Sequence, residues 1–332
     1  MELAVLDLGS TTFHLQHFRA DAAAGLESCL DLKICTSLGA QVFADGYIDS
    51  RSRAVALEAV DELLRASARR GYTQRAIVAT SAIRTAHNGR ALAREIEARH
   101  DCQVTILEPR EEARLAYLGQ LGFPGLAGRR FAMVDLGGGS VELSVGRDHQ
   151  IELTESLPLG AVRMRVAGAG HLGHSDDALR LRALSDQLRR QLDEPVRAIQ
   201  RLEPELIVFG SGSARAARKL LLRGHSLPGK VGPIVTGSFR HELSALFGHT
   251  PQELIALGVE PARSTTVLTS ATIMLQILEL LGAEHAVVSD RGLRDGVAGE
   301  LLSRLTRASG VFRSSAPRDM PSAANGAREA LG

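Results

Sequence analysis

Two short stretches of the chain carry the same residue types, and these types suit the binding of phosphate. Residues 5–15 read Val-Leu-Asp-Leu-Gly-Ser-Thr-Thr-Phe-His-Leu, and residues 133–143 read Met-Val-Asp-Leu-Gly-Gly-Gly-Ser-Val-Glu-Leu. In each, an apolar run ends in Asp-Leu-Gly, and three small or hydroxyl residues precede a second apolar run. Backbone N–H groups in such a turn can converge on an anion, and Ser and Thr hydroxyls add donors. An Asp at the end of the first run suits a hard divalent cation that bridges phosphate oxygens.

The spacing of the two stretches indicates a duplicated unit. Asp7 and Asp135 lie 128 residues apart, which is close to the length of one domain. A single copy is most simply an ordinary hairpin, because Asp and Gly are common turn residues. Two copies in phase instead indicate one such turn per domain. Facing each other across a cleft, the two turns would hold a phosphate chain from both sides.

A third glycine turn follows a later apolar run. Leu206–Phe209 leads into Gly210-Ser211-Gly212-Ser213 and a helical pattern, an arrangement that suits an anion at a helix N-terminus. A plain tight turn explains the same residues equally well. The chain has no Gly-x-x-x-x-Gly-Lys-Ser/Thr phosphate loop, no His-Glu-x-x-His and no Gly-x-Ser-x-Gly, so the enzyme classes that carry these motifs are not indicated.

The overall charge does not predict a surface that attracts polyanions. The 332 residues include 39 Lys and Arg against 38 Asp and Glu, a net charge of +1. We therefore expect no nucleic-acid and no membrane partner, and any polyanion must be bound locally. All but three of the basic residues are Arg, an excess that we ascribe to base composition because Ala and Gly are abundant too.

Other features indicate a cytoplasmic protein. Cys29, Cys35 and Cys102 are too few and too scattered for a disulfide framework or a zinc site, which favours a reducing compartment. The N-terminus lacks a basic leader, so no signal peptide is expected. The apolar stretch Val267–Leu281 is interrupted by polar residues and predicts a buried helix, not a membrane span.

Hydrophobic periodicity and the positions of Gly and Pro predict two α/β domains and a tail. The stretch 122–128 is rich in Gly and Pro, so we predict a first domain over 1–122 and a second over 123–308, with the last helix packed back on the first domain. Residues 309–332 lack periodicity and are predicted to be disordered. The predicted strands are Leu3–Leu8, a run from Phe13, Glu27–Cys35, Ala76–Thr80, Val104–Leu107, Phe131–Val134, Val141–Val145, Leu206–Phe209 and Ala286–Val288, and the predicted helices are Ser52–Arg70, Arg90–Arg99, Glu111–Gln120, Asp176–Arg201, one after Gly212, Thr266–Leu281 and Gly296–Thr306.

At these motifs the sequence resembles the exopolyphosphatase / guanosine pentaphosphate phosphohydrolase family. The resemblance covers about residues 3–305 and rests on several motifs in the family's order: Asp7–Leu15, Thr80–Arg84 with Asn88-Gly89, Glu111–Leu115, Asp135–Leu143, Gly210–Gly212 and Ser289–Gly296. It implies two domains of the actin-like, ribonuclease-H-like ATPase fold with the active site in the interdomain cleft. The chain is similar to a short form without the C-terminal His-Asp-type helical domain of larger members.

Two positions depart from the family pattern. Thr11 stands where the family usually has Asn, which keeps a polar donor. Glu108-Pro109 stands where the family usually has Ser-Gly, which removes backbone flexibility and adds a negative charge near Glu112.

The resemblance also implies roles for individual residues. Glu112 matches the catalytic carboxylate that orients and deprotonates water, although the residues alone allow Glu111 and Glu112 to be simple first-turn acids. Asp135 and Glu142 would hold Mg²⁺, with Asp7 as the symmetric candidate; the residues alone equally allow Glu142 to be an edge-exposed charge. The implied phosphate-binding residues are Gly9, Ser10, Thr11, Thr12, Arg84, Gly137, Gly138, Gly139, Ser140, Gly210, Ser211, Gly212 and, more weakly, Arg263.

The function expected from the resemblance is Mg²⁺-dependent hydrolysis of a terminal phosphoanhydride. The substrate would be inorganic polyphosphate, guanosine pentaphosphate, or both, and the family suggests a homodimer. One alternative is a non-catalytic regulatory protein that binds guanosine tetraphosphate or pentaphosphate, which only Glu108-Pro109 supports. Another is a kinase or ATPase of the same superfamily, against which the short length and Glu111–Leu115 argue.

Overall fold

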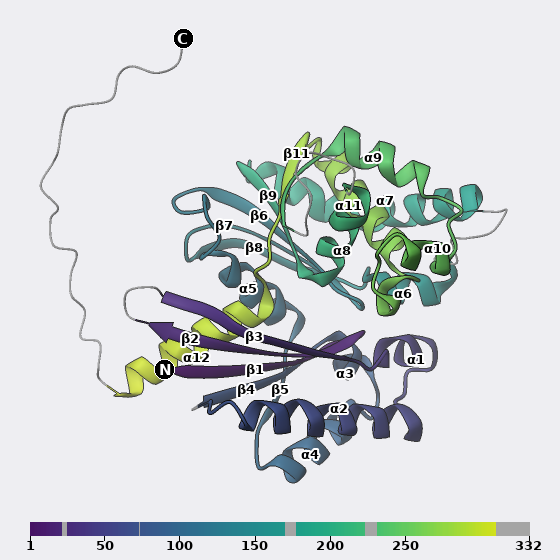
Figure 1. The fold of residues 1–332 in the computed structure, drawn as a ribbon. Coiled ribbons are helices and arrows are strands. Elements are labelled where there is room, and N and C mark those ends of the chain that lie inside the picture. Colours follow the sequence, from purple (N-terminus) through teal and green to yellow (C-terminus); the bar gives the residue numbers. More distant parts are fainter. Residues whose placement is uncertain (22–24, 73, 170–176, 223–230, 310–332) are drawn as a thin grey trace, which may run out of the picture.

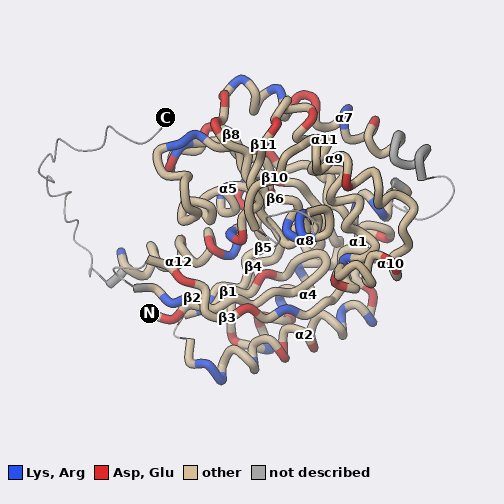
Figure 2. Tube along the Cα trace, turned by 45° about the horizontal axis from the view of Figure 1, so that its top comes forward, with Lys and Arg blue, Asp and Glu red and all other residues tan. Residues whose placement is uncertain are grey.

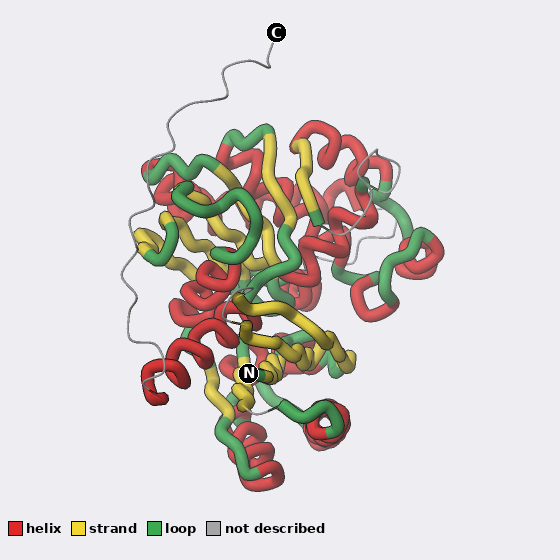
Figure 3. Tube along the Cα trace, turned by 60° about the vertical axis from the view of Figure 1, so that its left-hand side comes forward, coloured by secondary structure: helices red, strands yellow, loops and turns green. Residues whose placement is uncertain are grey.

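The computed structural model describes residues 1–21, 25–72, 74–169, 177–222 and 231–309. Two β-sheets, each with helices on its faces, form the two halves of the molecule (Figure 1). Figure 3 shows the strands in two groups with most helices outside them. The predicted disordered tail lies, apart from its first residue, outside the described residues.

The first sheet has five strands in the order β3-β2-β1-β4-β5. β1 is buried on both faces, which explains its uninterrupted apolar run. Leu3 and Val5 pack with the C-terminal helix, whereas Ala4 and Leu6 pack with helices on the opposite face. The strands are β1 (Glu2–Leu8), β2 (Thr12–Asp21), β3 (Gly25–Cys35), β4 (Gln74–Ala79) and β5 (Val104–Ile106).

The second sheet has six strands in the order β10-β11-β9-β6-β7-β8. Its strands are β6 (Arg130–Leu136), β7 (Val141–Arg147), β8 (Gln150–Leu157), β9 (Leu206–Gly210), β10 (Gly232–Val235) and β11 (His285–Val288). Five of them, β8-β7-β6-β9-β11, repeat the first sheet's pattern of two antiparallel pairings followed by two parallel ones. The predicted α/β class is therefore confirmed, and the two halves share one topology.

Helices of the first half begin and end at residues that stabilise their termini. The side chain of Asp49 accepts a hydrogen bond from the Ser52 amide and caps α2, and Pro109 occupies the first turn of α5. The sequence predictions missed α1, which begins at Leu38. The helices are α1 (Leu38–Asp45), α2 (Ser50–Ala68), α3 (Ser81–Thr85), α4 (Gly89–His100) and α5 (Pro109–Gln120).

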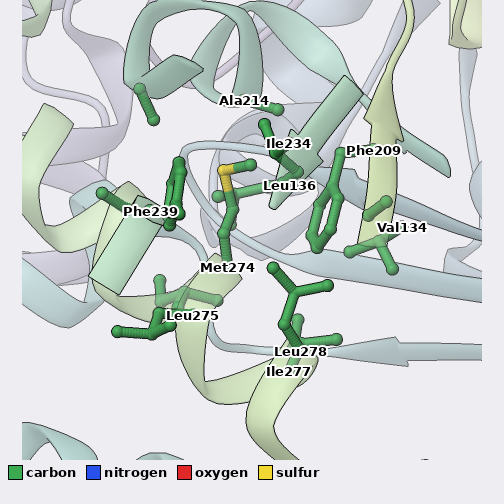
Figure 4. Packing of buried hydrophobic residues seen from close by; sticks show 14 of the residues in the cluster. Val134, Leu136, Phe209, Ala214, Ile234, Phe239, Met274, Leu275, Ile277 and Leu278 are labelled. Carbon is green, nitrogen blue, oxygen red and sulfur yellow. The ribbon is translucent and has the colours of Figure 1, made fainter. Parts of the chain in front are cut away.

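Helices of the second half surround one buried helix, α11. α11 contacts α7, α8 and α9, so nearly all of its side chains are buried, the polar Thr269, Ser270, Thr272 and Gln276 among them. Figure 4 shows Met274 and Leu278 of α11 packed toward Phe209 of β9. The helices are α6 (Ala161–Met164) with a π-helical turn at Arg165–Ala169, α7 (Asp177–Arg201), α8 (Ser211–Leu221), α9 (Thr236–Ala245), α10 (Pro251–Ala256), a 3₁₀ turn at Pro261–Arg263, α11 (Val267–Leu281) and α12 (Leu293–Ser309). Among the described residues, no helix has the length and apolar character needed to cross a membrane.

α5 and α12 lie against each other between the two sheets (Figure 1). α12 packs on Leu3 and Val5 of the first sheet, whereas Tyr117 of α5 stacks on Phe131 of the second. A Cβ atom on Gly296 of α12 would collide with the backbone of α5, so only glycine allows the two helices this close. The predicted domain boundary at residues 122 and 123 stays a prediction.

Candidate active site

Both repeated turns line one cavity of about 990 Å³ between the two halves of the molecule. The cavity reaches from these turns along β3 to the segment that follows α10. Most of the predicted site residues line it, namely Asp7, Gly9, Ser10, Thr11, Thr12, Glu112, Asp135, Gly137, Gly138, Gly139, Ser140, Glu142, Ser211, Gly212 and Arg263. Residues far apart in the sequence thus meet here.

The two turns lie in direct contact. A Cβ atom on Gly138 would lie 2.9 Å from Thr11 Oγ1 and 3.1 Å from Ser10 Cβ. A Cβ on Gly139 would lie 2.5 Å from Phe43 Cζ. A side chain at position 138 would push the two turns apart, and one at position 139 would collide with Phe43 and Ser81 of the first half, so glycine is needed at both positions for the approach of one half to the other.

Hydrogen bonds fix which way the second turn presents its amides. The carbonyl of Gly137 accepts from the Ala161 amide at 3.1 Å, and the carbonyl of Gly138 accepts from the Val162 amide at 2.8 Å. Both carbonyls therefore point toward α6. In a trans peptide the following N–H points the opposite way, so the amides of Gly138 and Gly139 face away from α6.

Carbonyls of the first turn are held in the same manner. The carbonyl of Ser10 accepts from the Gly39 amide at 2.7 Å, and that of Thr11 accepts from the Ser37 amide at 3.0 Å. The amides of Thr11 and Thr12 consequently point away from this segment. Amides oriented together in this way form an anion-binding concavity.

Glu112 lies in the first turns of α5 and is 7% exposed. Its Oε2 accepts a hydrogen bond from Arg84 Nη1 at 2.7 Å, and the same nitrogen donates to the Leu107 carbonyl at 2.6 Å. Burial raises the pKa of Glu112 to about 7, against the opposing effect of Arg84; Asp7 and Asp135 raise it further. A carboxylate with a pKa near neutrality is suited to accept a proton from water.

Asp135 and Glu142 lie opposite each other on the adjacent strands β6 and β7. Burial, followed by the charge of Asp7, raises the pKa of Asp135 to about 6. Burial, with Glu112 and Asp135 nearby, also raises the pKa of Glu142 well above its usual value, although Ser156 Oγ donates to its Oε1 at 2.9 Å. Glu142 is 3% exposed, so it faces the cavity and is not an edge-exposed charge.

Asp7 forms a direct ion pair with an arginine, which Asp135 does not do within the described residues. Arg294 Nη1 lies 3.3 Å from Asp7 Oδ2, and its Nε donates to Gln16 Oε1 at 2.8 Å. Burial raises the pKa of Asp7, and Arg294 lowers it in part. The other oxygen, Oδ1, is buried and has no hydrogen-bond partner.

These carboxylates suit a hard divalent cation, and phosphate oxygens of the substrate would complete its coordination. In the part of the chain that the structure describes, no group of three or more His, Cys, Asp or Glu is arranged to hold a metal by itself. Mg²⁺ is commonly held by one or two carboxylates together with phosphate oxygens and water, so a three-carboxylate cage is not needed. The unpartnered oxygen of Asp7 and the mutual repulsion of Asp135 and Glu142 are what a cation would relieve.

Four arginines line the cavity, and one of them, Arg291, lies 3.7 Å from the Asp295 carboxylate. Arg263 donates to Ser213 Oγ at 3.1 Å and packs against Gly212, so the third glycine turn and this Arg form one wall. Arg215 and Arg294 line the cavity too. Neither was predicted as a site residue, although Arg215 follows the third glycine turn and Arg294 lies in the motif Ser289–Gly296. The position of Arg215 after a glycine turn and that of Arg294 within a motif are the sequence features that could have indicated them.

Two predicted phosphate-binding residues do not line the cavity. Arg84 reaches the site through its ion pair with Glu112. Gly210 caps α8 and packs closely against Met133. The departure at Glu108-Pro109 is local: Glu108 is exposed and outside the cavity lining, and Pro109 starts α5.

Comparisons with known proteins find relatives that match most of this chain. Exopolyphosphatase 1 of Mycobacterium tuberculosis is 27% identical over 304 residues, which cover 90% of this chain and 87% of that protein. A crystal structure of an exopolyphosphatase from Cytophaga hutchinsonii matches with a TM-score of 0.83 at 20% identity, covering 92% of this chain and 98% of the other.

A second solved structure shows the same fold. The Ppx/GppA family member of Aquifex aeolicus matches with a TM-score of 0.74 at 22% identity, covering 92% of this chain and 98% of the other. These matches confirm the two-domain actin-like fold. The family model described as the Ppx/GppA phosphatase family matches residues 19–305. The chain belongs to the Ppx/GppA phosphatase family.

Proposed function

We propose that this chain is an exopolyphosphatase, which removes the terminal phosphate of inorganic polyphosphate by hydrolysis. The observation that carries the proposal is Glu112: a buried carboxylate with a pKa of about 7, placed in a cavity between two turns of phosphate-binding type. The name of the mycobacterial relative, exopolyphosphatase 1, supports the same substrate.

Glu112 acts as the general base in the proposed reaction. It orients a water molecule and accepts its proton as the water oxygen attacks the terminal phosphorus. The bond between that phosphorus and the bridging oxygen breaks, and the bridging oxygen leaves on the shortened chain. Arg84 keeps part of the Glu112 population ionised by its contact at 2.7 Å and holds the carboxylate in place.

Amides of the two turns bind the phosphate oxygens from both sides. The N–H groups of Thr11, Thr12, Gly138 and Gly139 face away from the segments that hold their carbonyls, so they are available to phosphate. Asp135, Glu142 and Asp7 would hold Mg²⁺. When bound, this ion supplies neutralisation of phosphate charge.

Guanosine pentaphosphate is a second proposed substrate, because its terminal phosphate is held by the same kind of anhydride bond. The expectations of a homodimer, a cytoplasmic location and no nucleic-acid or membrane partner belong to the same proposal. Figure 2 shows Lys and Arg interspersed with Asp and Glu along outer helices such as α2, a pattern that favours no polyanion-binding face there.

Replacing Glu112 tests the proposal most directly. Glu112→Gln removes the base at constant size, so the release of inorganic phosphate from polyphosphate should fall by about 10²–10⁴-fold. Glu111→Gln is a matched control, because Glu111 sits one residue away and binds Arg114 outside the cavity. Its activity should stay near that of the unchanged protein.

Assays with polyphosphate, guanosine tetraphosphate and ATP distinguish a hydrolase from a regulatory protein and a kinase. Phosphate release should occur from polyphosphate with Mg²⁺ and disappear when the divalent cation is removed. Full activity of Glu112→Gln would remove Glu112 from the mechanism. Tight binding of guanosine tetraphosphate without turnover of any substrate would favour a regulatory protein, and ATP-dependent labelling of an acceptor would favour a kinase.

A further inference from the structure

A row of three residues leads from the carboxylate cluster to the edge of the first sheet. Asp7 on β1 is directly opposite His14 on β2, and His14 is directly opposite Lys33 on β3. Residues in such register share a face of the sheet, and adjacent strands lie about 4.8 Å apart. Lys33 is therefore roughly 10 Å from Asp7 along the same cavity wall.

Lys33 spans the cavity to reach the second half of the molecule. Its Nζ lies 2.9 Å from both carboxylate oxygens of Glu260, a residue that precedes the 3₁₀ turn at Pro261–Arg263. Both side chains line the cavity and stay partly exposed, at 45% for Lys33 and 43% for Glu260. The ion pair thus crosses the part of the cavity that lies away from Glu112.

Glu260 also lies beside a second cation of the cavity. Arg263 Nε is 3.8 Å from Glu260 Oε2, and Arg263 donates to Ser213 in the third glycine turn. A nearby lysine, Lys219, donates to the Gly258 carbonyl two residues before Glu260. The chain has only three lysines; two of them line this cavity, and the third, Lys230, is outside the described residues.

We propose that Glu260 is an internal competitor for substrate and that the Lys33–Glu260 ion pair determines which chain lengths the enzyme prefers. A carboxylate and a phosphate offer the same charge-assisted hydrogen bonds to Lys and Arg. A polyphosphate chain long enough to extend from the carboxylate cluster to β3 displaces Glu260 and binds Lys33 in its place. A chain that ends before β3 leaves the ion pair intact. This inference rests on the proposed function.

The physical basis is a competition between two anions for one cation. Removing the charge of Glu260 frees Lys33 for substrate and removes repulsion between Glu260 and a phosphate chain. Removing the charge of Lys33 takes away a contact that only long chains make. Exposed ion pairs contribute little free energy, so each change should alter the affinity for long chains by about two- to fivefold.

The experiment measures KM for phosphate release from long-chain polyphosphate and from inorganic tripolyphosphate. Its readout is the KM for long-chain polyphosphate divided by the KM for tripolyphosphate. Glu260→Gln should lower this ratio by about two- to fivefold, and Lys33→Met should raise it by a similar factor. Lys33→Arg should return the ratio toward that of the unchanged protein, because the cation is restored.

A matched control breaks an ion pair elsewhere. Glu95→Gln removes the partner of Arg53, a similarly exposed pair between α4 and α2 that lies outside the cavity lining. It should leave the ratio unchanged. Measuring thermal stability of all variants identifies any that are misfolded, and only variants that melt like the unchanged protein are compared.

Each outcome decides between defined conclusions. If the unchanged protein releases no phosphate from either substrate, the proposed function is wrong. If it releases phosphate but Glu260→Gln and Lys33→Met leave the ratio unchanged, or shift both KM values equally, only the inference about Glu260 is wrong. A ratio that rises in Glu260→Gln would show that the ion pair itself, and not free Lys33, favours long chains.

Discussion

The two repeated turns have the same backbone plan, but their aspartates have different direct partners. In the first, Asp7 lies across from His14 and 3.3 Å from Arg294. In the second, Asp135 lies across from Glu142, and no described Lys or Arg forms an ion pair with either carboxylate. His14 and Glu142 occupy equivalent positions of the repeat, seven residues after the aspartate.

This difference indicates that the two turns have different roles, and that the second turn binds the cation. Burial raises the pKa of both aspartates, but Asp7 forms an ion pair with Arg294, whereas Asp135 faces the second buried carboxylate, Glu142, whose pKa it helps to raise. The second turn is therefore the better place for a cation, and Asp7 contributes at most its one unpartnered oxygen. The duplication supplied two anion-binding turns, and the residue at the His14/Glu142 position distinguishes them.

Asp135→Asn and Asp7→Asn should distinguish the roles of the two turns most clearly. Loss of Asp135 removes a cation ligand that no neighbour replaces, and metal-assisted charge stabilisation is worth several kcal/mol. The kcat for phosphate release should therefore fall by about 100-fold or more. Asp7→Asn should reduce kcat less and should keep the dependence of activity on divalent cation.

The outcome would be read from cation titrations of both variants. Asp135→Asn should need a higher Mg²⁺ concentration for half-maximal activity, while Asp7→Asn should need about the same as the unchanged protein. Equal shifts in both variants would mean that the two aspartates act as one cation site, and the proposed division would be abandoned.

The second turn is also more tightly enclosed than the first. Its backbone is clamped by Arg163, whose Nε donates to the Gly139 carbonyl at 2.8 Å and whose guanidinium lies 4.0 Å from the centre of the Phe43 ring. The Nη2 of Arg163 donates to Thr85 Oγ1 at 3.2 Å, so one side chain joins the second turn to the first half of the molecule. No matching Arg holds the first turn among the described residues.

Gly139→Ala should therefore disturb the enclosed turn. The new Cβ would lie 2.5 Å from Phe43 Cζ, and overpacking of this kind costs about 1–3 kcal/mol. We expect a lower melting temperature and a loss of activity of about tenfold, because the turn amides are displaced. Thermal unfolding and phosphate release measure the two effects.

Gly299→Ala in α12 is the matched control. A Cβ there meets no atom within 4 Å, and alanine is favoured over glycine inside a helix by about 0.5–1 kcal/mol. This variant should be slightly more stable and fully active. If Gly139→Ala behaves in the same way, the second turn is not confined as its contacts indicate.

The sequence predicted the repeat because backbone chemistry leaves a local signature. Buried strands such as β1 and β6 appear as apolar runs, and the Asp-Leu-Gly turns follow them directly. β8 was missed because it lies at the sheet edge with half-buried side chains, so its apolar signal is weak. α1 was missed too, since Ser37 before it has a left-handed conformation without a capping side chain.

Contacts between the two halves could not be predicted in this way. Arg294 reaches Asp7 across 287 positions of the sequence, and Lys33 reaches Glu260 across 227. With 36 arginines in the chain, no local pattern distinguishes Arg163 from those on the surface, and the motif that contains Arg294 does not name its partner Asp7. Only the meeting of the two sheets assigns them to the cavity, because charge pairing across a cleft is a property of tertiary structure.

The smallest expected effect concerns stability, and it follows from the sign of the pKa shifts. The pKa values of Asp135 and Glu112 are raised to about 6 and about 7, so the folded state binds protons that the unfolded state has already released. Their contribution to stability is therefore present at low pH and is lost as the pH rises through these values.

A divalent cation binds the ionised carboxylates and should restore stability mainly above about pH 7. At about ten times its Kd, Mg²⁺ adds about 1.4 kcal/mol, which raises the melting temperature by about 2 °C. Thermal melts with and without Mg²⁺, at about pH 5 and about pH 8, measure this difference. The rise at the higher pH should vanish in Asp135→Asn and remain in Asp7→Asn; a rise of equal size at both pH values would mean that the cation does not bind the carboxylates of the second turn.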